Sequence, residues 1–316
     1  MRFSKMSGKR NALRALAMLL ALLSVVTLLP ACGQSAAPVP VSTVAPVVDA
    51  TDAPTESPRV ASAEDMTTVE AVLEEGMEPI DASSLLPGEY PVVMKSSSSM
   101  FKPEACLLTV ADGQLTVLLD MRSDSYAYLY PGTALEAASA SEADYLVPTP
   151  REEGGYSFVL PISALDEELK CAAYSRKKEL WYDRTLLFRA DSLPLEAFVE
   201  GLYPTVESLG LEDGQYTVEV TLRGGSGKSS VQSPALLKVR DGLATAQILW
   251  SSSNYDYMKV DGEQFFPLSL ENGSCFAIPV AVFDRAIPVL ADTTAMSEPH
   301  EIAYTLHFAA DSIQAA

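Results

Sequence analysis

His300 and Tyr304 are the two residues of this sequence whose types and spacing best suit binding chemistry. Residues 300–308 alternate in a way that predicts a β-strand, and residues four apart on a strand share a face. An imidazole on such a face could hold a metal ion, because histidine is a common iron ligand. Alternatively, Tyr304 fills a hydrophobic core and His300 lies at the exposed entrance of the strand. The other histidine, His307, would point to the opposite face, so we do not expect both imidazoles to chelate one ion.

Two further segments would have to complete a binding site beside His300. Their candidate ligand-binding residues are Ser229, Ser230, Tyr255, Tyr257 and Met258. Successive side chains of a strand point to opposite faces, so either Tyr255 and Tyr257 or Asp256 and Met258 should line a cleft, and not both sets. Met258 could act as a second iron ligand only if a β-bulge turned it inward.

No catalytic residue is predicted, and the protein is not expected to be an enzyme. Residues 224–229 contain Gly-Lys-Ser, but Leu222 stands where a phosphate-binding loop needs glycine. We interpret this segment as a flexible loop between strands. Carboxylates such as Asp292 are scattered along an acidic chain, which is typical of a solvated surface.

Short alternating segments predict that the candidate residues lie on an antiparallel β-sandwich. Residues 215–222 alternate apolar and polar side chains, which is the period of a half-buried strand. Further strands are predicted at residues 236–239, 244–250, 276–280 and 302–308, with turns such as Asp241-Gly242 between them. The fold class is therefore all-β, with two immunoglobulin-like sandwiches in tandem after a disordered tether.

The tandem arrangement is predicted because residues 214–313 are an imperfect copy of residues 88–193. A repeat of about 120 residues indicates duplicated domains, since solenoid repeats recur every ~20–50 residues. We therefore expect the same strand order in both copies, with the largest differences at residues 132–157. Five pairs of blocks match in order, beginning at Asp112 and Asp241, Tyr126 and Tyr255, Phe158 and Phe276, Tyr174 and Met296, and Phe188 and Phe308.

The match sets Lys178 and Tyr182 of the first copy against His300 and Tyr304 of the second. A lysine is protonated at neutral pH, with an ordinary pKa near ~10.4, and is a poor iron ligand. The second copy is therefore the predicted ligand binder, and the first is interpreted as a spacer or docking surface.

The N-terminus predicts export and anchoring. Basic residues precede an apolar run at residues 15–29, which is too short to span a bilayer as a helix. The run ends in Leu29-Pro30-Ala31-Cys32 and resembles a bacterial lipoprotein signal, although Pro30 is not favoured at its position. The resemblance implies that Cys32 is lipidated and holds the protein at the outer face of the cell membrane.

Five regions are expected along the chain. They are a lipoprotein signal peptide at 1–31, an Ala/Pro/Ser/Thr-rich disordered tether at 32–80, a first β-sandwich at 81–194, a linker at 195–211 and a second β-sandwich at 212–316. The composition of the tether cannot bury enough surface to offset the entropy of ordering. A short helix is predicted within it, at residues 63–75.

Charge and cysteine content exclude some functions. Removal of the five basic residues before Cys32, and of no acid, changes the formal charge from −20 to −25, so nucleic acid is not an expected partner. Cys106, Cys171 and Cys275 form an odd set that is not a disulfide framework. Cys106 could pair with Cys171, and buried free thiols are the alternative.

The second copy resembles the near-iron-transporter (NEAT) domain, a haem-binding immunoglobulin-like unit of Gram-positive cell surfaces. The resemblance rests on residues 213–218, 233–242, 248–255, 258–262 and 304–308. It implies capture of haem or another iron complex and a partner surface transport system. In the family the closing strand carries Tyr-x-x-x-Tyr, whose first tyrosine binds iron, and a Ser-rich lip covers the haem.

In this sequence His300 and Tyr304 hold the two tyrosine positions, and Ser229-Ser230 stands at the lip. The resemblance therefore implies that His300 would bind iron and that Tyr304 would brace it. The alternative is an adhesive or structural envelope module without a small-molecule ligand.

Overall fold

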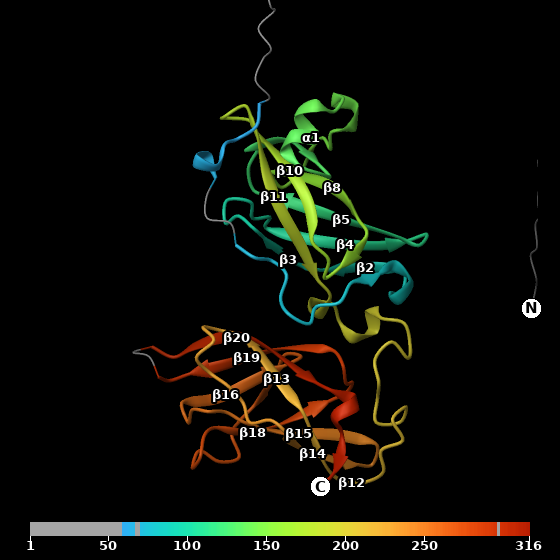
Figure 1. Cartoon of the computed structure of the whole chain (residues 1–316), viewed down its shortest axis with the longest axis vertical. Coiled ribbons are helices and arrows are strands. Elements are labelled where there is room, and N and C mark those ends of the chain that lie inside the picture. The colour runs from blue at the N-terminus through green and yellow to red at the C-terminus, as the bar shows by residue number, and fades with distance from the viewer. Residues whose placement is uncertain (1–58, 67–69, 296–297) are drawn as a thin grey trace, which may run out of the picture. The chain divides into compact units, whose positions relative to one another are not determined.

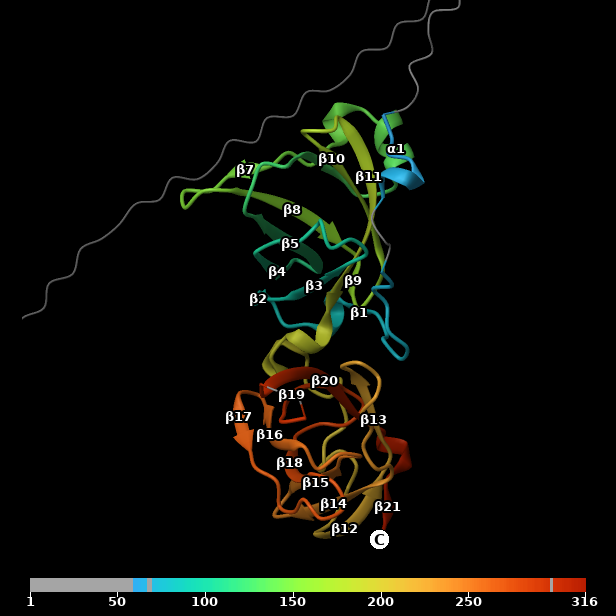
Figure 2. The same cartoon turned by 90° about the vertical axis from the view of Figure 1, so that its left-hand side faces the viewer.

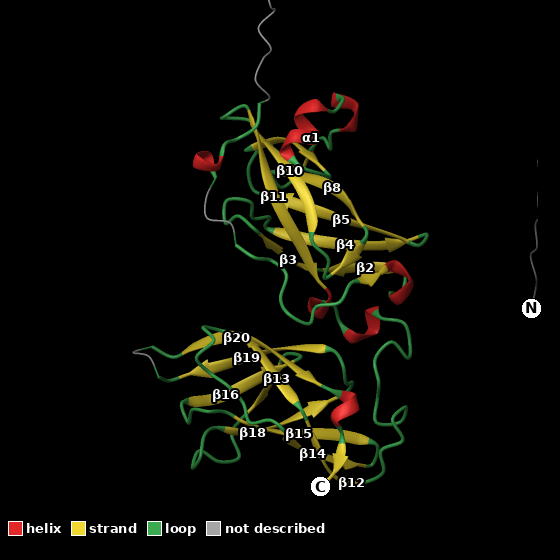
Figure 3. Ribbon diagram, viewed as in Figure 1, coloured by secondary structure: helices red, strands yellow, loops and turns green. Residues whose placement is uncertain are grey.

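The computed structural model describes residues 59–66, 70–295 and 298–316, all within one contact unit, Glu56–Ala316. As predicted, these residues form an all-β protein, and the strands of its sheets pair in antiparallel fashion (Figures 1 and 3). The predicted signal peptide at 1–31, the lipidated Cys32 and the tether as far as residue 58 lie outside the described residues. No helix in the described part of the chain is long and apolar enough to cross a membrane.

The first sandwich encloses its hydrophobic core between sheets with the orders β2-β4-β5-β8-β7 and β3-β11-β10-β6, and β1 pairs with β9. Its strands are β1 (Ile80–Asp81), β2 (Gly88–Pro91), β3 (Val93–Ser96), β4 (Ala105–Ala111), β5 (Gln114–Met121), β6 (Tyr126–Tyr130), β7 (Thr149–Pro150), β8 (Tyr156–Ile162), β9 (Ala164–Leu165), β10 (Leu169–Ser175) and β11 (Leu180–Arg189).

The second sandwich encloses its core between sheets with the orders β18-β15-β14-β12-β21 and β13-β20-β19-β16-β17. Its strands are β12 (Gly214–Val218), β13 (Val220–Gly224), β14 (Ala235–Arg240), β15 (Leu243–Leu249), β16 (Tyr255–Val260), β17 (Glu263–Phe265), β18 (Cys275–Val280), β19 (Ala286–Thr293), β20 (His300–Phe308) and β21 (Gln314–Ala315).

The described residues contain few helices, and all of these are short. They are η1 (Ala63–Asp65), η2 (Ala82–Ser84), α1 (Ala134–Ser139), η3 (Glu142–Asp144), η4 (Ala190–Ser192), η5 (Leu195–Ala197) and η6 (Ala310–Ser312), of which only α1 is an α-helix. The segment predicted as a loop at residues 224–229 connects β13 to β14 without a helix.

The two sandwiches share one strand order, which is the order expected if the sequence repeat reflects a common topology. The order β2-β4-β5-β8 corresponds to β12-β14-β15-β18, and β3-β11-β10-β6 corresponds to β13-β20-β19-β16. The first copy differs where extra residues were noted, at residues 132–157, because α1, η3 and β7 lie there.

An aspartate fixes the same turn in both copies. Asp166 has φ 53°, and its carboxylate accepts a hydrogen bond from the Ala190 amide at 2.9 Å. Asp284 has φ 57°, and its carboxylate accepts from the Ala310 amide at 2.8 Å. Aspartate tolerates left-handed backbone because its short side chain bonds locally. Each aspartate thereby ties the turn before β10 or β19 to the end of the neighbouring long strand.

Residues 59–66 and 70–80, predicted as the end of the tether, pack against the first sandwich. Val60 forms a β-bridge with Trp181, and Val72 is buried. The helix predicted at 63–75 is replaced by the single turn η1, and described residues 70–79 contain no helix. A helix of that length is marginal on its own, and Val72 gains more by packing on the sandwich.

The predicted linker at residues 195–211 also packs. Phe198 lies in the first core and Val206 in the second, each almost fully buried. Arg285, just before β19, donates a hydrogen bond to the carbonyl of Leu193, and the Phe283 amide donates to the carbonyl of Pro204. The linker is therefore part of the packed structure.

Cys106, Cys171 and Cys275 are free thiols, so the alternative of a Cys106–Cys171 disulfide is wrong. Burial raises the pKa of Cys106 and Cys171 to about 12. These thiols pack as small apolar groups.

Candidate functional site

His300 and Tyr304 lie in different surroundings. Both stand on β20, but His300 is exposed at the start of the strand and Tyr304 is 5% exposed. This is the core-filling alternative for Tyr304, with His300 at the strand entrance. His307 is half-buried further along β20.

A β-bulge decides which residues of β16 face inward. The register shifts between Tyr255, which pairs with Thr293, and Tyr257, which pairs with Asp292. Tyr255 and Met258 are consequently both buried, although they are an odd number of positions apart. The prediction that the cleft would take Tyr255 with Tyr257, or Met258 with Asp256, is wrong, because the bulge adds one residue and reverses the alternation.

The inward side chains form an aromatic cluster around Trp250. The ring of Trp250 lies 4.3 Å from that of Tyr255 and 5.0 Å from that of Tyr304, measured between centroids. Its indole nitrogen donates to the sulfur of Met258 at 3.2 Å. The hydroxyls of Tyr255 and Tyr304 are hydrogen-bonded at 2.9 Å. Burial, together with that hydrogen bond, raises the pKa of Tyr255 to about 12, so its hydroxyl stays protonated at neutral pH.

The Ser229-Ser230 lip is bonded onto this cluster. The hydroxyl of Ser229 lies 2.6 Å from that of Tyr255. The amide of Ser230 donates to the Ser251 hydroxyl at 3.1 Å, and the Ser251 amide donates back to the Ser230 carbonyl. Gly225 lies against the ring of Tyr304, since a Cβ atom placed on it would be 2.4 Å from that ring. A porphyrin could reach the Tyr304 phenol only by displacing these groups, so the residues do not fit haem in this arrangement.

Tyr257 lies outside the aromatic cluster. Its hydroxyl donates to the carboxylate of Glu301 at 2.9 Å, and Lys259 forms an ion pair with the same carboxylate at 2.5 Å. The hydrogen bond to Glu301 raises the pKa of Tyr257 to about 12. Tyr257 therefore belongs to a surface polar network and not to a pocket shared with Tyr255.

Arg184, and not Tyr182, holds the position in the first copy that is equivalent to Tyr304 in the second. Phe188 pairs with Met94 in the first sandwich as Phe308 pairs with Val220 in the second, and both strands then run on without a bulge. Counting back along the strands sets Arg184 against Tyr304 and Leu180 against His300. The sequence match with Lys178 and Tyr182 was two residues out of step, because the second copy has two more residues in the hairpin loop before β20.

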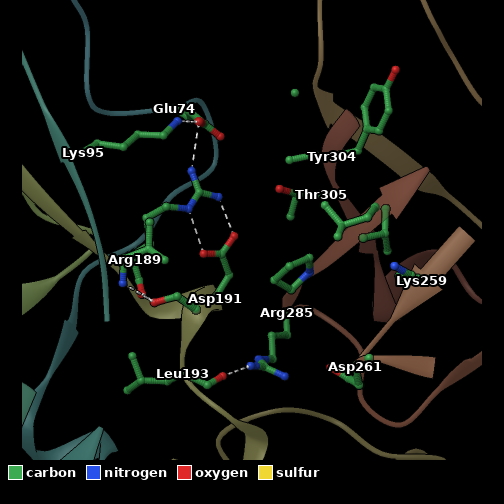
Figure 4. Close-up of a pocket in the computed structure, with 18 residues that line it drawn as sticks. Glu74, Lys95, Arg189, Asp191, Leu193, Lys259, Asp261, Arg285, Tyr304 and Thr305 are labelled. Atoms are coloured by element: carbon green, nitrogen blue, oxygen red, sulfur yellow. Dashed lines mark hydrogen bonds and ion pairs between the residues drawn. The ribbon is translucent and has the colours of Figure 1, made fainter. Parts of the chain in front are cut away.

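A cleft with a volume of about 630 Å³ lies between the two sandwiches (Figure 4). Of the predicted binding residues, only Tyr304 is among those that line it. Figure 2 shows β19 and β20 on the side of the second sandwich that faces the first. The lining residues are Glu74, Val93, Lys95, Arg189, Asp191, Ser192, Leu193, Gly224, Lys259, Asp261, Gly262, Arg285, Pro288, Val289, Leu290, Ala303, Tyr304 and Thr305.

One side of the cleft carries a compensated ion cluster. The guanidinium of Arg189 binds both carboxylate oxygens of Asp191, at 2.8 and 2.5 Å, and reaches Glu74 at 3.0 Å (Figure 4). Lys95 pairs with the same Glu74 carboxylate. Although burial opposes the shift, Lys95 and Arg189 lower the pKa of Glu74. These four charges satisfy one another and fix the shape of this side of the cleft.

The opposite side is largely apolar. Leu290 is 36% exposed, and Pro288, Val289 and Ala303 extend the apolar wall. Val93, which is 55% exposed, adds an apolar side chain from the side that carries the ion cluster. Ligand pockets of about 300–1,000 Å³ with an apolar lining and a few polar groups commonly occur between domains. The cleft has the size and character of a small-molecule site.

Arg285 also lines the cleft. It is 8% exposed, and one terminal nitrogen donates to the Leu193 carbonyl at 2.6 Å. The guanidinium carbon lies 5.2 Å from the ring centroid of Phe198 and 6.0 Å from that of Tyr203. The Nε atom is buried and has no hydrogen-bond partner.

Sequence reasoning did not single out the residues of this cleft. Glu74 was assigned to a tether, and Arg189 and Asp191 were not proposed as binding residues. One signal was present: at the shared turn the second copy has Asp284-Arg285 where the first has Asp166-Glu167. No protein-family model matches the chain, and no curated protein matches it.

Proposed function

We propose that this chain is a lipid-anchored binding protein of the outer face of the cell membrane, and that its ligand lies in the cleft between the two sandwiches. The cleft itself carries the proposal, since it combines an apolar wall, a fixed ion cluster and a volume of about 630 Å³. The pattern at Cys32 supports the anchor, and the acidic composition supports an exposed, solvated exterior.

This proposal moves the ligand away from the site predicted at His300. Trp250, Tyr255 and Tyr304 already fill the space under the Ser229 lip, whereas the cleft is open. Haem capture at His300, with a surface transport system as partner, stays a separate prediction and is tested separately below.

An adhesive role is a second candidate, favoured by one surface feature. Phe266, Leu268 and Leu270 alternate along the loop after β17, and they are 68%, 63% and 50% exposed. Such rows of exposed apolar side chains mark protein interaction sites. If this loop is adhesive, the double variant Phe266→Ser, Leu268→Ser will reduce attachment of cells that display the protein, with the cleft variants described next unaffected.

The cleft is tested with 1-anilinonaphthalene-8-sulfonate, an amphipathic dye whose fluorescence increases in apolar sites. Ala303 is exposed on β20 in the cleft wall, so Ala303→Trp should fill the cleft and remove saturable dye binding by the full chain. The matched control is Gln247→Trp, at an exposed position on β15 outside the cleft, which should leave binding unchanged. Equal dye binding by wild type and Ala303→Trp would contradict the proposal.

The anchor is tested by fractionation. Cys32→Ala should release the protein from membranes, because the lipid chains that would be attached there supply ~0.8 kcal/mol per buried methylene. Membrane retention of the variant at the wild-type level would show that something other than Cys32 holds the protein.

A further inference from the structure

We infer that Arg285 is an anion receptor, so that the ligand of the cleft is an amphipathic anion with a carboxylate or phosphate head and an apolar body. This inference rests on the proposed function and names its ligand class. It starts from Arg285, a residue that is 8% exposed and whose Nε atom is buried and has no hydrogen-bond partner.

A buried cation without a carboxylate is unusual. The ion pairs found in the described part of the chain do not include Arg285. Burying a charge is costly unless it is paired and hydrogen-bonded, and the Leu193 carbonyl supplies only one neutral acceptor. An anionic ligand would provide the missing compensation.

The neighbouring carboxylates are already engaged or exposed. Asp191 binds Arg189 through both oxygens, and Asp284, next to Arg285 in the chain, accepts from the Ala310 amide. Asp261 lines the cleft but is exposed and does not contact Arg285 (Figure 4). The positive charge of Arg285 therefore stays available to a ligand.

The guanidinium is also held in place before any ligand arrives. Phe198 and Tyr203 lie against it, and the bond to Leu193 fixes one end of its plane. A guanidinium presents its donors as a rigid fork that matches carboxylate and phosphate oxygens. Little conformational entropy would be lost when an anion binds such a fixed group.

The apolar wall defines the rest of the ligand. Val93 from the first sandwich and Leu290 from the second line the same cleft as Arg285, and both are exposed to it. Covering these side chains gains roughly 25 cal/mol per Å² of apolar surface removed from water. An acyl chain or an aromatic body attached to an acidic head would satisfy both parts of the site.

The test is calorimetric titration of the full chain with decanoate, decyl phosphate and decanol, each below its micelle-forming concentration. Wild type should bind both anions at least 10-fold more tightly than decanol. Arg285→Met should lose at least 10-fold in affinity for the anions, which is about 1.4 kcal/mol, and should bind decanol as wild type does. Preference for decanoate or decyl phosphate assigns the head group.

Two further variants keep the test decisive. Arg240→Met, at an exposed position on β14, should bind all three compounds as wild type does. Arg285→Lys keeps a charge and guards against a folding defect, and it should retain the preference for anions over decanol.

If Arg285→Met binds decanoate with wild-type affinity while Ala303→Trp abolishes binding, the anion receptor is overturned and the cleft stands. If Ala303→Trp leaves binding unchanged, the proposed function itself fails.

Discussion

The two sandwiches share a backbone frame but cover one face of it differently. In the first, the outer face of the β3-β11-β10-β6 sheet is covered by α1 and by Val60, which pack around Trp181. In the second, the position of Trp181 is held by Glu301, and the same face of the β13-β20-β19-β16 sheet lines the cleft. The strands are therefore alike in the two copies, and the segments that cover part of this face in the first copy leave the matching part uncovered in the second.

A few polar side chains accept hydrogen bonds from backbone amides at equivalent positions in the two sandwiches. Ser192 accepts from the Val93 amide at 3.0 Å, and Ser312 accepts from the Glu219 amide at 2.8 Å, as the paired aspartates do at the neighbouring turns. These bonds specify geometry without specifying the surface. The chemistry of each copy can change at positions such as Glu167 and Arg285 while the frame is kept.

The largest predicted difference between the copies is haem binding. The resemblance at His300 predicts that the full chain shows a saturable Soret shift with haem and that His300→Ala abolishes it, which would require the Ser229 lip and Gly225 to move away from Tyr304. Lys178→Ala and Leu180→Ala in the first sandwich should leave the shift unchanged. Absorption titration measures this, and no saturable change in wild type would end the haem prediction and leave the cleft as the binding site.

The aromatic residues that close each core can be compared by truncation. Trp250 covers Tyr255 in the second sandwich, and Phe101 covers Tyr126 in the first at 5.3 Å between ring centroids. Both are 1% exposed, so Trp250→Ala and Phe101→Ala should each lower the free energy of unfolding by about 3–5 kcal/mol. Urea denaturation measures the loss, with exposed Phe266→Ala as the control. A loss below ~1 kcal/mol would mean that the neighbouring loop refills the space.

The buried turn aspartate of the first copy, Asp166, predicts a pH effect on stability. Burial raises the pKa of Asp166 to about 6 from 3.8, so the folded state binds its proton more tightly than the unfolded state. Protonated Asp166 therefore adds roughly 1–3 kcal/mol to the free energy of unfolding. This contribution is fully present below about pH 4 and is lost as the pH rises through about 6.

Asp166→Asn should flatten this part of the stability curve, because asparagine does not titrate. Asparagine also keeps an acceptor for the Ala190 amide, so the turn should be preserved. Asp284→Asn, at the matching turn, is the control. Denaturation midpoints between pH 4 and 6 measure both variants, and parallel curves for Asp166→Asn and wild type would contradict the assignment.

The smallest predicted effect concerns the lip. Ser229→Ala removes the hydrogen bond to Tyr255 and should lower the free energy of unfolding by about 1 kcal/mol. Ser226→Ala, on the exposed loop nearby, should change nothing measurable. If the two variants are equally stable, the hydrogen bond between Ser229 and Tyr255 does not stabilise the lip.

Much of the fold could be predicted because strand patterns are local. Residues 215–222 alternate in the sequence, and β12 and β13 lie there, separated at Glu219. The repeated blocks predicted the common strand order, since matching turns and apolar positions specify matching strands. The helix at 63–75 was predicted incorrectly, because its apolar residues pack on a sandwich whose surface the local pattern does not describe.

The site was less predictable. Alternation put Tyr255 and Met258 on opposite faces, and a single extra residue at the bulge brought both inward. Tyr304 was placed correctly on an inward face, but whether that face holds a ligand or a core depends on Trp250, which comes from another strand. A strand pattern describes faces, and it does not describe what lies opposite them.

The sequence alone determined the all-β class and the acidic character of this chain, because both depend on composition or on short-range periodicity, and it predicted the duplication and the export. Only the tertiary structure decided that Glu74, Arg189 and Arg285 meet at one cleft, since they come from three distant segments. It also showed that Arg189 finds carboxylates and Arg285 does not. Whether a buried charge is compensated depends on distances in space, and those are set by packing and not by order along the chain.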